Sequence, residues 1–93
     1  MANVVLYTSS IAFSSKTRSN TNSLKYILQS KGVQYDEVDL SVDSQKMEDM
    51  VKASGGSKVL PQLHVDGKLV GGYDDVQEME DVGELSKALG LAS

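Results

Sequence analysis

The side chains with the greatest capacity for chemistry are a run of hydroxyls near the N-terminus and a single histidine. Nine of the sixteen residues from Thr8 to Ser23 are Ser or Thr. A serine hydroxyl becomes an effective nucleophile only beside a general base, and the one histidine, His64, stands far along the chain in a predicted strand. No oxyanion loop is evident either, so a serine hydrolase is poorly supported. One histidine also cannot complete the usual multi-ligand metal site, and we expect no metal.

Length and cysteine content limit the function further. With 93 residues the chain is expected to be a single domain, residues 1–93, whose site lies on one core. It contains no cysteine. The absence of cysteine excludes a disulfide scaffold, a thiolate zinc site, an iron-sulfur cluster and every thiol-disulfide mechanism that uses a residue of this chain.

Charge is distributed unevenly along the chain. The first 35 residues carry four bases and no acid, or +4, whereas the remainder carries five bases and 13 acids, or -8. Asp74 to Glu84 holds six acids and no base. Such polarity suits steering toward a charged partner, and the overall acidity disfavours nucleic acid. With no apolar run of membrane-spanning length, we expect a cytoplasmic protein without a membrane partner.

Apolar spacing predicts the elements that position these residues. Val4–Tyr7 is typical of a buried strand, and Val33–Leu40 offers a second strand. A helix is predicted to begin between Lys16 and Asn20 and to end at Gly32, with Leu24, Ile27 and Leu28 on its apolar face. A second helix is predicted around Met47, Met50 and Val51, with N-cap candidates in Ser41–Ser44 and an end at Gly55 and Gly56.

The strongest local signal is a hairpin. Leu63–Val65 and Lys68–Val70 flank Asp66-Gly67, a pair typical of a two-residue type I′ turn. After the hairpin, Asp74 can cap a helix that carries Val76 and Met79, and a last segment with Val82, Leu85, Ala88 and Leu89 ends near Gly90. The predicted order is therefore β-α-β-α-β-β-α, an α/β fold with a four-stranded mixed sheet and helices on both faces.

The segment Val59–Asp75, which contains the cis-proline candidate Pro61 and the Gly71-Gly72 pair, resembles the second half of a glutaredoxin. In that family a T-V-P-x motif precedes the hairpin and G-G-[CS]-D follows it. The element order agrees with the thioredoxin/glutaredoxin-like fold, so the resemblance covers nearly the whole chain. The polar segment Thr8–Ser23 and the Gly72-Tyr73-Asp74 pattern resemble more specifically the SH3-binding glutamic-acid-rich-protein-like family, in which the redox motif is lost.

The chain departs from the glutaredoxin pattern at the redox motif. The family's C-x-x-C or C-x-x-S falls here in Ser9–Ser15, where only hydroxyls are available. A helix dipole does not turn a serine into an appreciable alkoxide, and a serine forms no mixed disulfide. We therefore predict no enzymatic activity of the glutaredoxin type. SH3 recognition through P-x-x-P also fails, because Pro61 is the only proline.

The resemblance implies a relic binding site. By position, the backbone of Leu60 would pair with an extended peptide, and the Tyr73 amide and Asp74 carboxylate would hold a γ-glutamyl end. The predicted site comprises Ser9, Ser10, Phe13, Leu60, Pro61, Gly72, Tyr73 and Asp74. Structural alternatives remain open: Pro61 as a loop residue, Asp74 as a helix N-cap, and His64 as a half-buried strand residue opposite Leu69. Tyr73 is expected to be exposed at the rim, where its bulk narrows or fills the pocket.

Three functions follow from this pattern. The first is a non-catalytic adaptor or regulatory subunit that binds a protein partner, monomeric by itself. The second is a glutathione or small-thiol binding protein that works without a resident cofactor and binds glutathione only at millimolar concentrations. The third is a structural component of a larger assembly. The missing cysteine favours the first and third, and the retained Gly71–Asp75 segment favours the second.

Overall fold

A computed structural model describes residues 3–9 and 15–90, and within these ranges four strands form one mixed sheet in the order β2-β1-β3-β4. β1 pairs in parallel with β2 and antiparallel with β3, which pairs antiparallel with β4. The elements are β1 (Val4–Thr8), α1 (Ser15–Ser30), β2 (Asp36–Asp39), α2 (Lys46–Ala53), β3 (Gln62–Val65), β4 (Lys68–Gly71), α3 (Tyr73–Asp81) and α4 (Leu85–Ala88). This arrangement confirms the predicted fold class.

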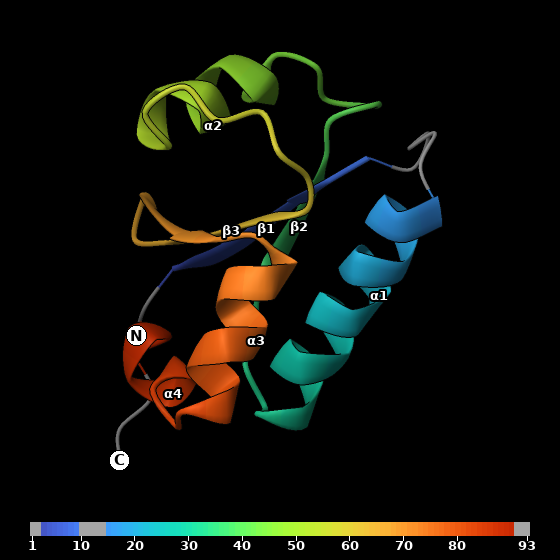
Figure 1. Cartoon of the computed structure of the whole chain (residues 1–93). Coiled ribbons are helices and arrows are strands. Elements are labelled where there is room, and N and C mark those ends of the chain that lie inside the picture. Colours follow the sequence, from blue (N-terminus) through green and yellow to red (C-terminus); the bar gives the residue numbers. More distant parts are fainter. Residues whose placement is uncertain (1–2, 10–14, 91–93) are drawn as a thin grey trace.

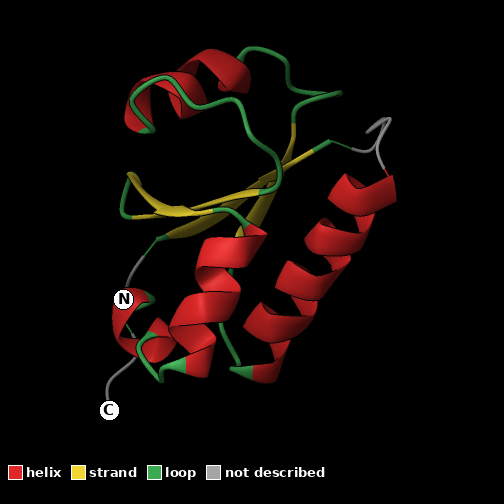
Figure 2. Ribbon diagram, viewed as in Figure 1, coloured by secondary structure: helices red, strands yellow, loops and turns green. Residues whose placement is uncertain are grey.

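Helices cover both faces of the sheet, as Figures 1 and 2 show: α1, α3 and α4 lie on one face and α2 lies on the other. Successive side chains of each strand point to opposite faces of the sheet, so the strands contribute side chains to two separate layers. Leu6 of β1 and Leu63 of β3 are fully buried on the side of α1 and α3, in one apolar cluster. The members of that cluster are Val4, Leu6, Leu24, Ile27, Leu28, Leu63, Val65, Val76, Leu85 and Leu89.

The hairpin between β3 and β4 forms as the sequence predicts. Asp66 and Gly67 have φ angles of 53° and 79°, the left-handed values that a type I′ turn requires at both central positions. His64 lies opposite Leu69 and Val65 lies opposite Lys68 in the strand register. The side chain of Asp66 also accepts a hydrogen bond from the Asn3 backbone N–H at 2.8 Å, which ties the turn to the beginning of β1.

Several predicted boundaries move. β2 is shorter than the predicted strand, and the N-cap of α2 is Gln45 rather than a residue of Ser41–Ser44. The predicted order counts one helix after the hairpin, whereas the described residues form two, α3 and α4, because Gly83 adopts a φ of +76° that ends the first. None of the helices in the described ranges is long and apolar enough to cross a membrane.

Candidate functional site

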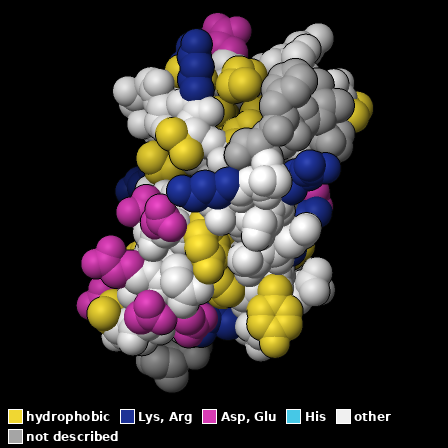
Figure 3. Space-filling view, turned by 45° about the vertical axis from the view of Figure 1, so that its right-hand side comes forward, with side chains coloured by type: hydrophobic (Ala, Val, Ile, Leu, Met, Phe, Trp, Pro, Cys, Tyr) yellow, Lys and Arg dark blue, Asp and Glu magenta, His cyan; other side chains and the backbone are white. Residues whose placement is uncertain are grey.

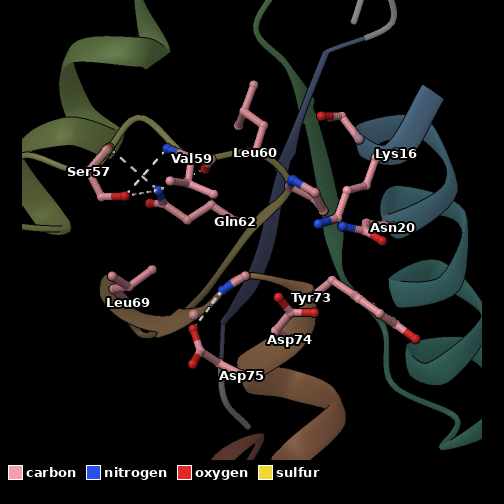
Figure 4. Close-up of a pocket in the computed structure, with 14 residues that line it drawn as sticks. Lys16, Asn20, Ser57, Val59, Leu60, Gln62, Leu69, Tyr73, Asp74 and Asp75 are labelled. Carbon is pink, nitrogen blue, oxygen red and sulfur yellow. Dashed lines mark hydrogen bonds between the residues drawn. The ribbon is translucent and has the colours of Figure 1, made fainter. Parts of the chain in front are cut away.

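A pocket of about 390 Å³ lies where three segments meet: the beginning of α1, the loop before β3, and the junction of β4 with α3 (Figure 4). Five of the predicted site residues line it: Leu60, Pro61, Gly72, Tyr73 and Asp74. Ser9 does not, because it lines a separate, smaller hollow on the side of α1 that faces β2. Ser10 and Phe13 lie outside the described residues. The structure therefore brings together the C-terminal part of the predicted site and separates Ser9 from it.

The backbone of Leu60 forms an open edge on this pocket. The peptide bond between Leu60 and Pro61 is cis. Neither the N–H nor the C=O of Leu60 makes a hydrogen bond with another described residue. Unpaired backbone groups at a pocket edge are the groups that an extended peptide uses to bind a protein. Leu60 therefore offers one donor and one acceptor to a ligand.

A buried glutamine holds the loop that carries this edge. Gln62 is only 1% exposed, and its amide Nε2 donates to the backbone carbonyl of Val59 at 3.1 Å and to that of Ser57 at 3.4 Å. Ser57 is held in turn by Ser54, whose Oγ accepts from the Ser57 N–H at 3.0 Å. Sequence analysis missed Gln62. The available signal was its place directly before the predicted strand Leu63–Val65, because an amide that enters the sheet needs hydrogen-bond partners.

His64 completes this network from inside the protein. It is 2% exposed, so the prediction of a half-buried residue is wrong, and its Nε2 is hydrogen-bonded to Oε1 of Gln62. Because that oxygen only accepts, the imidazole carries its proton on Nε2. The ring packs edge-on against Tyr7, with centroids 4.8 Å apart. Burial lowers the pKa of His64, and burial and the Asp49 charge raise the pKa of the Tyr7 hydroxyl, so both side chains stay neutral at pH 7.

Of the two glycines at the β4–α3 junction, Gly71 leaves no room for a side chain, whereas a Cβ on Gly72 would lie 3.3 Å from the Pro61 carbonyl oxygen. Gly71 has a φ of +148°, and a Cβ there would lie 2.5 Å from the Cβ of Asp75. Gly72 is the N-cap of α3, and its N–H donates to Oδ2 of Asp75 at 3.3 Å. The alternative interpretation of Asp74 as the N-cap is therefore wrong, because Asp75 satisfies the helix terminus. The carboxylate of Asp74 remains on the pocket wall (Figure 4).

Tyr73 does not fill the pocket. Its side chain is half-buried, packs against the apolar cluster and extends toward α1 (Figure 4). Its hydroxyl donates to Oε1 of Gln77 one turn later, at 3.3 Å. The expectation of an exposed residue at the rim is therefore wrong, because the ring finds apolar neighbours between the two helices. Tyr73 forms one wall of the pocket and leaves its volume open.

Opposite charges face each other across the pocket. Lys16 reaches in from α1, beside Asn20, and Asp74 lies on the opposite wall at the start of α3 (Figure 4). Neither charge forms an ion pair with a described residue, whereas Lys25 and Lys31 pair with Glu37 and Glu80. A ligand that carries both a carboxylate and an ammonium, on its termini or on its side chains, matches this arrangement.

Comparisons with known proteins agree with this geometry. The family model described as glutaredoxin matches residues 4–70. Glutaredoxin 3 of Escherichia coli strain K12 is 35% identical over 89 residues, covering 96% of this chain and 99% of its own. Glutaredoxin 1 of Rickettsia prowazekii is 38% identical over 66 residues, 70% of each chain.

Solved structures show the same fold. The C. albicans actin interacting protein Aip5 superposes with a TM-score of 0.78 at 23% identity, over 95% of this chain and 88% of its own. A buckwheat glutaredoxin in complex with glutathione superposes with a TM-score of 0.75 at 19% identity, over 98% and 83%. At these identities the two structures are evidence of the fold alone.

Proposed function

The chain belongs to the glutaredoxin family, and we propose that it uses the family's ligand pocket as a non-catalytic binding site for an extended segment of a protein partner. The unpaired backbone edge of Leu60, on a pocket with Lys16 and Asp74 on opposite walls, carries this proposal. With no cysteine, the chain has no thiolate to attack a disulfide, and binding is the part of glutaredoxin chemistry that these residues can perform.

A protein ligand is supported by two further observations. Val59, beside the open edge, is 65% exposed, so an incoming strand meets an apolar side chain as well as backbone groups. The fold neighbour Aip5 is named as an actin interacting protein, so one protein with this fold is named for its interaction with another protein. We further propose a monomeric adaptor in the cytoplasm. The finer resemblance to the SH3-binding glutamic-acid-rich-protein-like family stays a prediction.

Glutathione is the second candidate ligand, and Asp74 favours it. A carboxylate on the pocket wall pairs with the free ammonium of a γ-glutamyl group, and the first amides of α3 attract its carboxylate. The buckwheat neighbour was solved with glutathione bound. Without a cysteine the ligand gains no sulfur contact, and a few polar contacts of about 1 to 3 kcal/mol each leave binding in the millimolar range.

The proposal is tested by reversing the two pocket charges together. Lys16→Glu combined with Asp74→Lys keeps the net charge and exchanges the signs of the opposing walls. Affinity capture from native lysate, read by mass spectrometry, is expected to lose the proteins that the unmodified chain retains. The matched control is Lys68→Glu with Asp43→Lys, two exposed positions that do not line the pocket, and it should retain them. If the reversed and unmodified chains capture the same proteins equally, the pocket does not bind these proteins.

NMR titration separates the two ligands. Glutathione is expected to shift the amides of residues 59–62 and 71–75 only at millimolar concentration. Saturation at micromolar glutathione would place the small molecule ahead of the protein partner. Purified protein should also show no glutathione-dependent disulfide reduction above buffer, because no residue can form the mixed disulfide.

A further inference from the structure

A second and larger hollow lies on the other side of Tyr73. This groove, of about 790 Å³, runs between α1 and α3, and we call it the helix groove. Its α1 wall consists of Ser15, Arg18, Ser19, Asn22, Ser23 and Tyr26, with Ile27 beside them. These positions recur three and four residues apart, so they form one continuous face of the helix. Tyr73 and Gln77 form the α3 wall.

The α1 wall is polar and makes few contacts within the protein. The side chains of Ser15, Ser19, Asn22 and Ser23 make no hydrogen bond with another described residue. The Tyr26 ring is 73% exposed at the far end of the groove. In Figure 3 white atoms, which are uncharged polar side chains and backbone, extend along this side of the molecule, and acidic side chains gather to their left. The groove therefore offers hydrogen-bonding groups and an aromatic surface that the fold does not use.

Among the described residues that line the helix groove, Arg18 is the only charged one. It forms no ion pair with a described residue, although Lys25, two turns later, pairs with Glu37 at 2.9 Å. A guanidinium presents several N–H groups in a fixed plane, which suits a carboxylate or a phosphate. Arg18 also lines the smaller hollow that contains Glu37, but Glu37 pairs with Lys25. Since none of the described residues on the groove walls is acidic, an anion is the complementary ligand for Arg18 there.

The helix groove adjoins the pocket at Leu60, because Tyr73 lines both and forms the wall between them. The tyrosine is fixed by its contacts with the apolar cluster and by its hydrogen bond to Gln77. A tripeptide such as glutathione is small enough for the pocket of about 390 Å³ alone. A longer chain that crosses the Tyr73 wall reaches the groove.

Because the two hollows adjoin at Tyr73, we propose that the partner's extended segment crosses Tyr73 into the helix groove and places an anionic side chain, a carboxylate or a phosphate, on Arg18. The inference rests on the proposed function and adds the chemistry of the partner. It also supplies a basis for specificity: a protein segment contacts both the pocket and Arg18, whereas glutathione contacts the pocket alone.

The probe is a phage-displayed library of random dodecapeptides selected on the unmodified chain. Selected peptides are expected to carry Asp or Glu at a constant position, and to shift the amides of residues 59–62 together with those of Arg18 and Asn22. Arg18→Gln should weaken them by roughly 10-fold or more, the loss of one charge-assisted pair. Arg18→Lys should restore part of the affinity. Lys46→Gln, at an exposed position of α2, is the control and should leave the affinity unchanged.

Synthetic versions of one selected peptide, with Asp, phosphoserine or Asn at that position, separate the two anionic groups. The anionic version that binds more tightly identifies the group that Arg18 takes. If the Asn version binds as tightly as both, the inference is wrong. If the selected peptides shift the amides of residues 59–62 but bind Arg18→Gln as tightly as the unmodified chain, the inference about the helix groove is wrong and the proposed function still holds. A selection that yields no peptide able to shift residues 59–62 overturns both.

Discussion

The two faces of the sheet are built from different chemistry. Toward α1, α3 and α4 the strands present Leu6, Leu63 and other aliphatic residues to an uninterrupted apolar cluster. Toward α2 the same strands present Tyr7, Gln62 and His64, linked by a hydrogen bond and a ring contact. The described residues leave no buried side-chain polar atom on either face without a hydrogen-bond partner.

The two faces therefore have different roles: one stabilises the domain, and the other sets the shape of the site. Apolar contacts are non-directional and contribute in proportion to the area that they bury, whereas buried hydrogen bonds fix the orientation of the groups they join. Gln62 is both part of the polar layer and a lining residue of the pocket, and it holds the carbonyls of Ser57 and Val59. The apolar face therefore stabilises the domain, and the polar face orients the loop that carries Leu60.

The largest expected effect is on the apolar face. Leu24→Ala removes a fully buried side chain from the cluster and is expected to lower the free energy of unfolding by about 3 kcal/mol. Urea denaturation followed by circular dichroism measures the change. Ligand affinity of the folded fraction should stay the same, because Leu24 does not line the pocket. A loss of stability below about 1 kcal/mol would contradict the role assigned to this face.

Removing the glutamine tests the polar face. Gln62→Leu leaves the Nε2–H of His64 without an acceptor and releases the carbonyls of Ser57 and Val59, so we expect about 1 to 3 kcal/mol of destabilisation. Unlike Leu24→Ala, it should also change the amide shifts of residues 57–60 and weaken peptide binding. Gln29→Leu, at an exposed position of α1, is the control. If Gln62→Leu binds the peptide as tightly as the unmodified chain, the polar layer does not orient the site.

A fall in pH should lower the stability of the protein through the polar face of the sheet. Burial lowers the pKa of His64 from its ordinary 6.5, so the unfolded chain binds the proton more readily than the folded one. The stabilising effect of the neutral imidazole is complete above about pH 6.5 and is lost as the pH falls through the folded-state pKa. Urea midpoints measured between about pH 8 and pH 5 should therefore fall more steeply for the unmodified chain than for His64→Phe, in which no imidazole titrates. Parallel pH profiles would show that the histidine does not couple to folding.

The smallest effect is expected outside both layers. Lys25 and Glu37 form an ion pair at 2.9 Å with side chains that are 30% and 39% exposed. Solvent and salt screen such pairs, so Lys25→Gln should cost less than about 1 kcal/mol. Thermal denaturation at low and high salt would measure this cost, and the difference from the unmodified chain should shrink as salt is added. A loss of stability as large as that caused by Gln62→Leu would show that the polar layer contributes no more to stability than this exposed ion pair does.

The sequence by itself determined the features that depend on near neighbours in the chain. The hairpin follows from Asp66-Gly67, because both residues must adopt positive φ and these types tolerate it. The first helix follows from the spacing of Leu24, Ile27 and Leu28, which places their side chains on one face. The absence of cysteine excluded thiol chemistry without any structure.

Only the tertiary structure decided how the site is assembled, because its contacts join residues that are distant in the chain. Whether Ser9 lines the pocket depends on where α1 packs against the sheet, and the packing places it in another hollow. Tyr73 turns toward α1 because apolar neighbours are available there, and Asp75 rather than Asp74 reaches the helix terminus. Gln62 gained its role from a strand buried on both faces, where each polar atom needs a partner that the fold alone supplies.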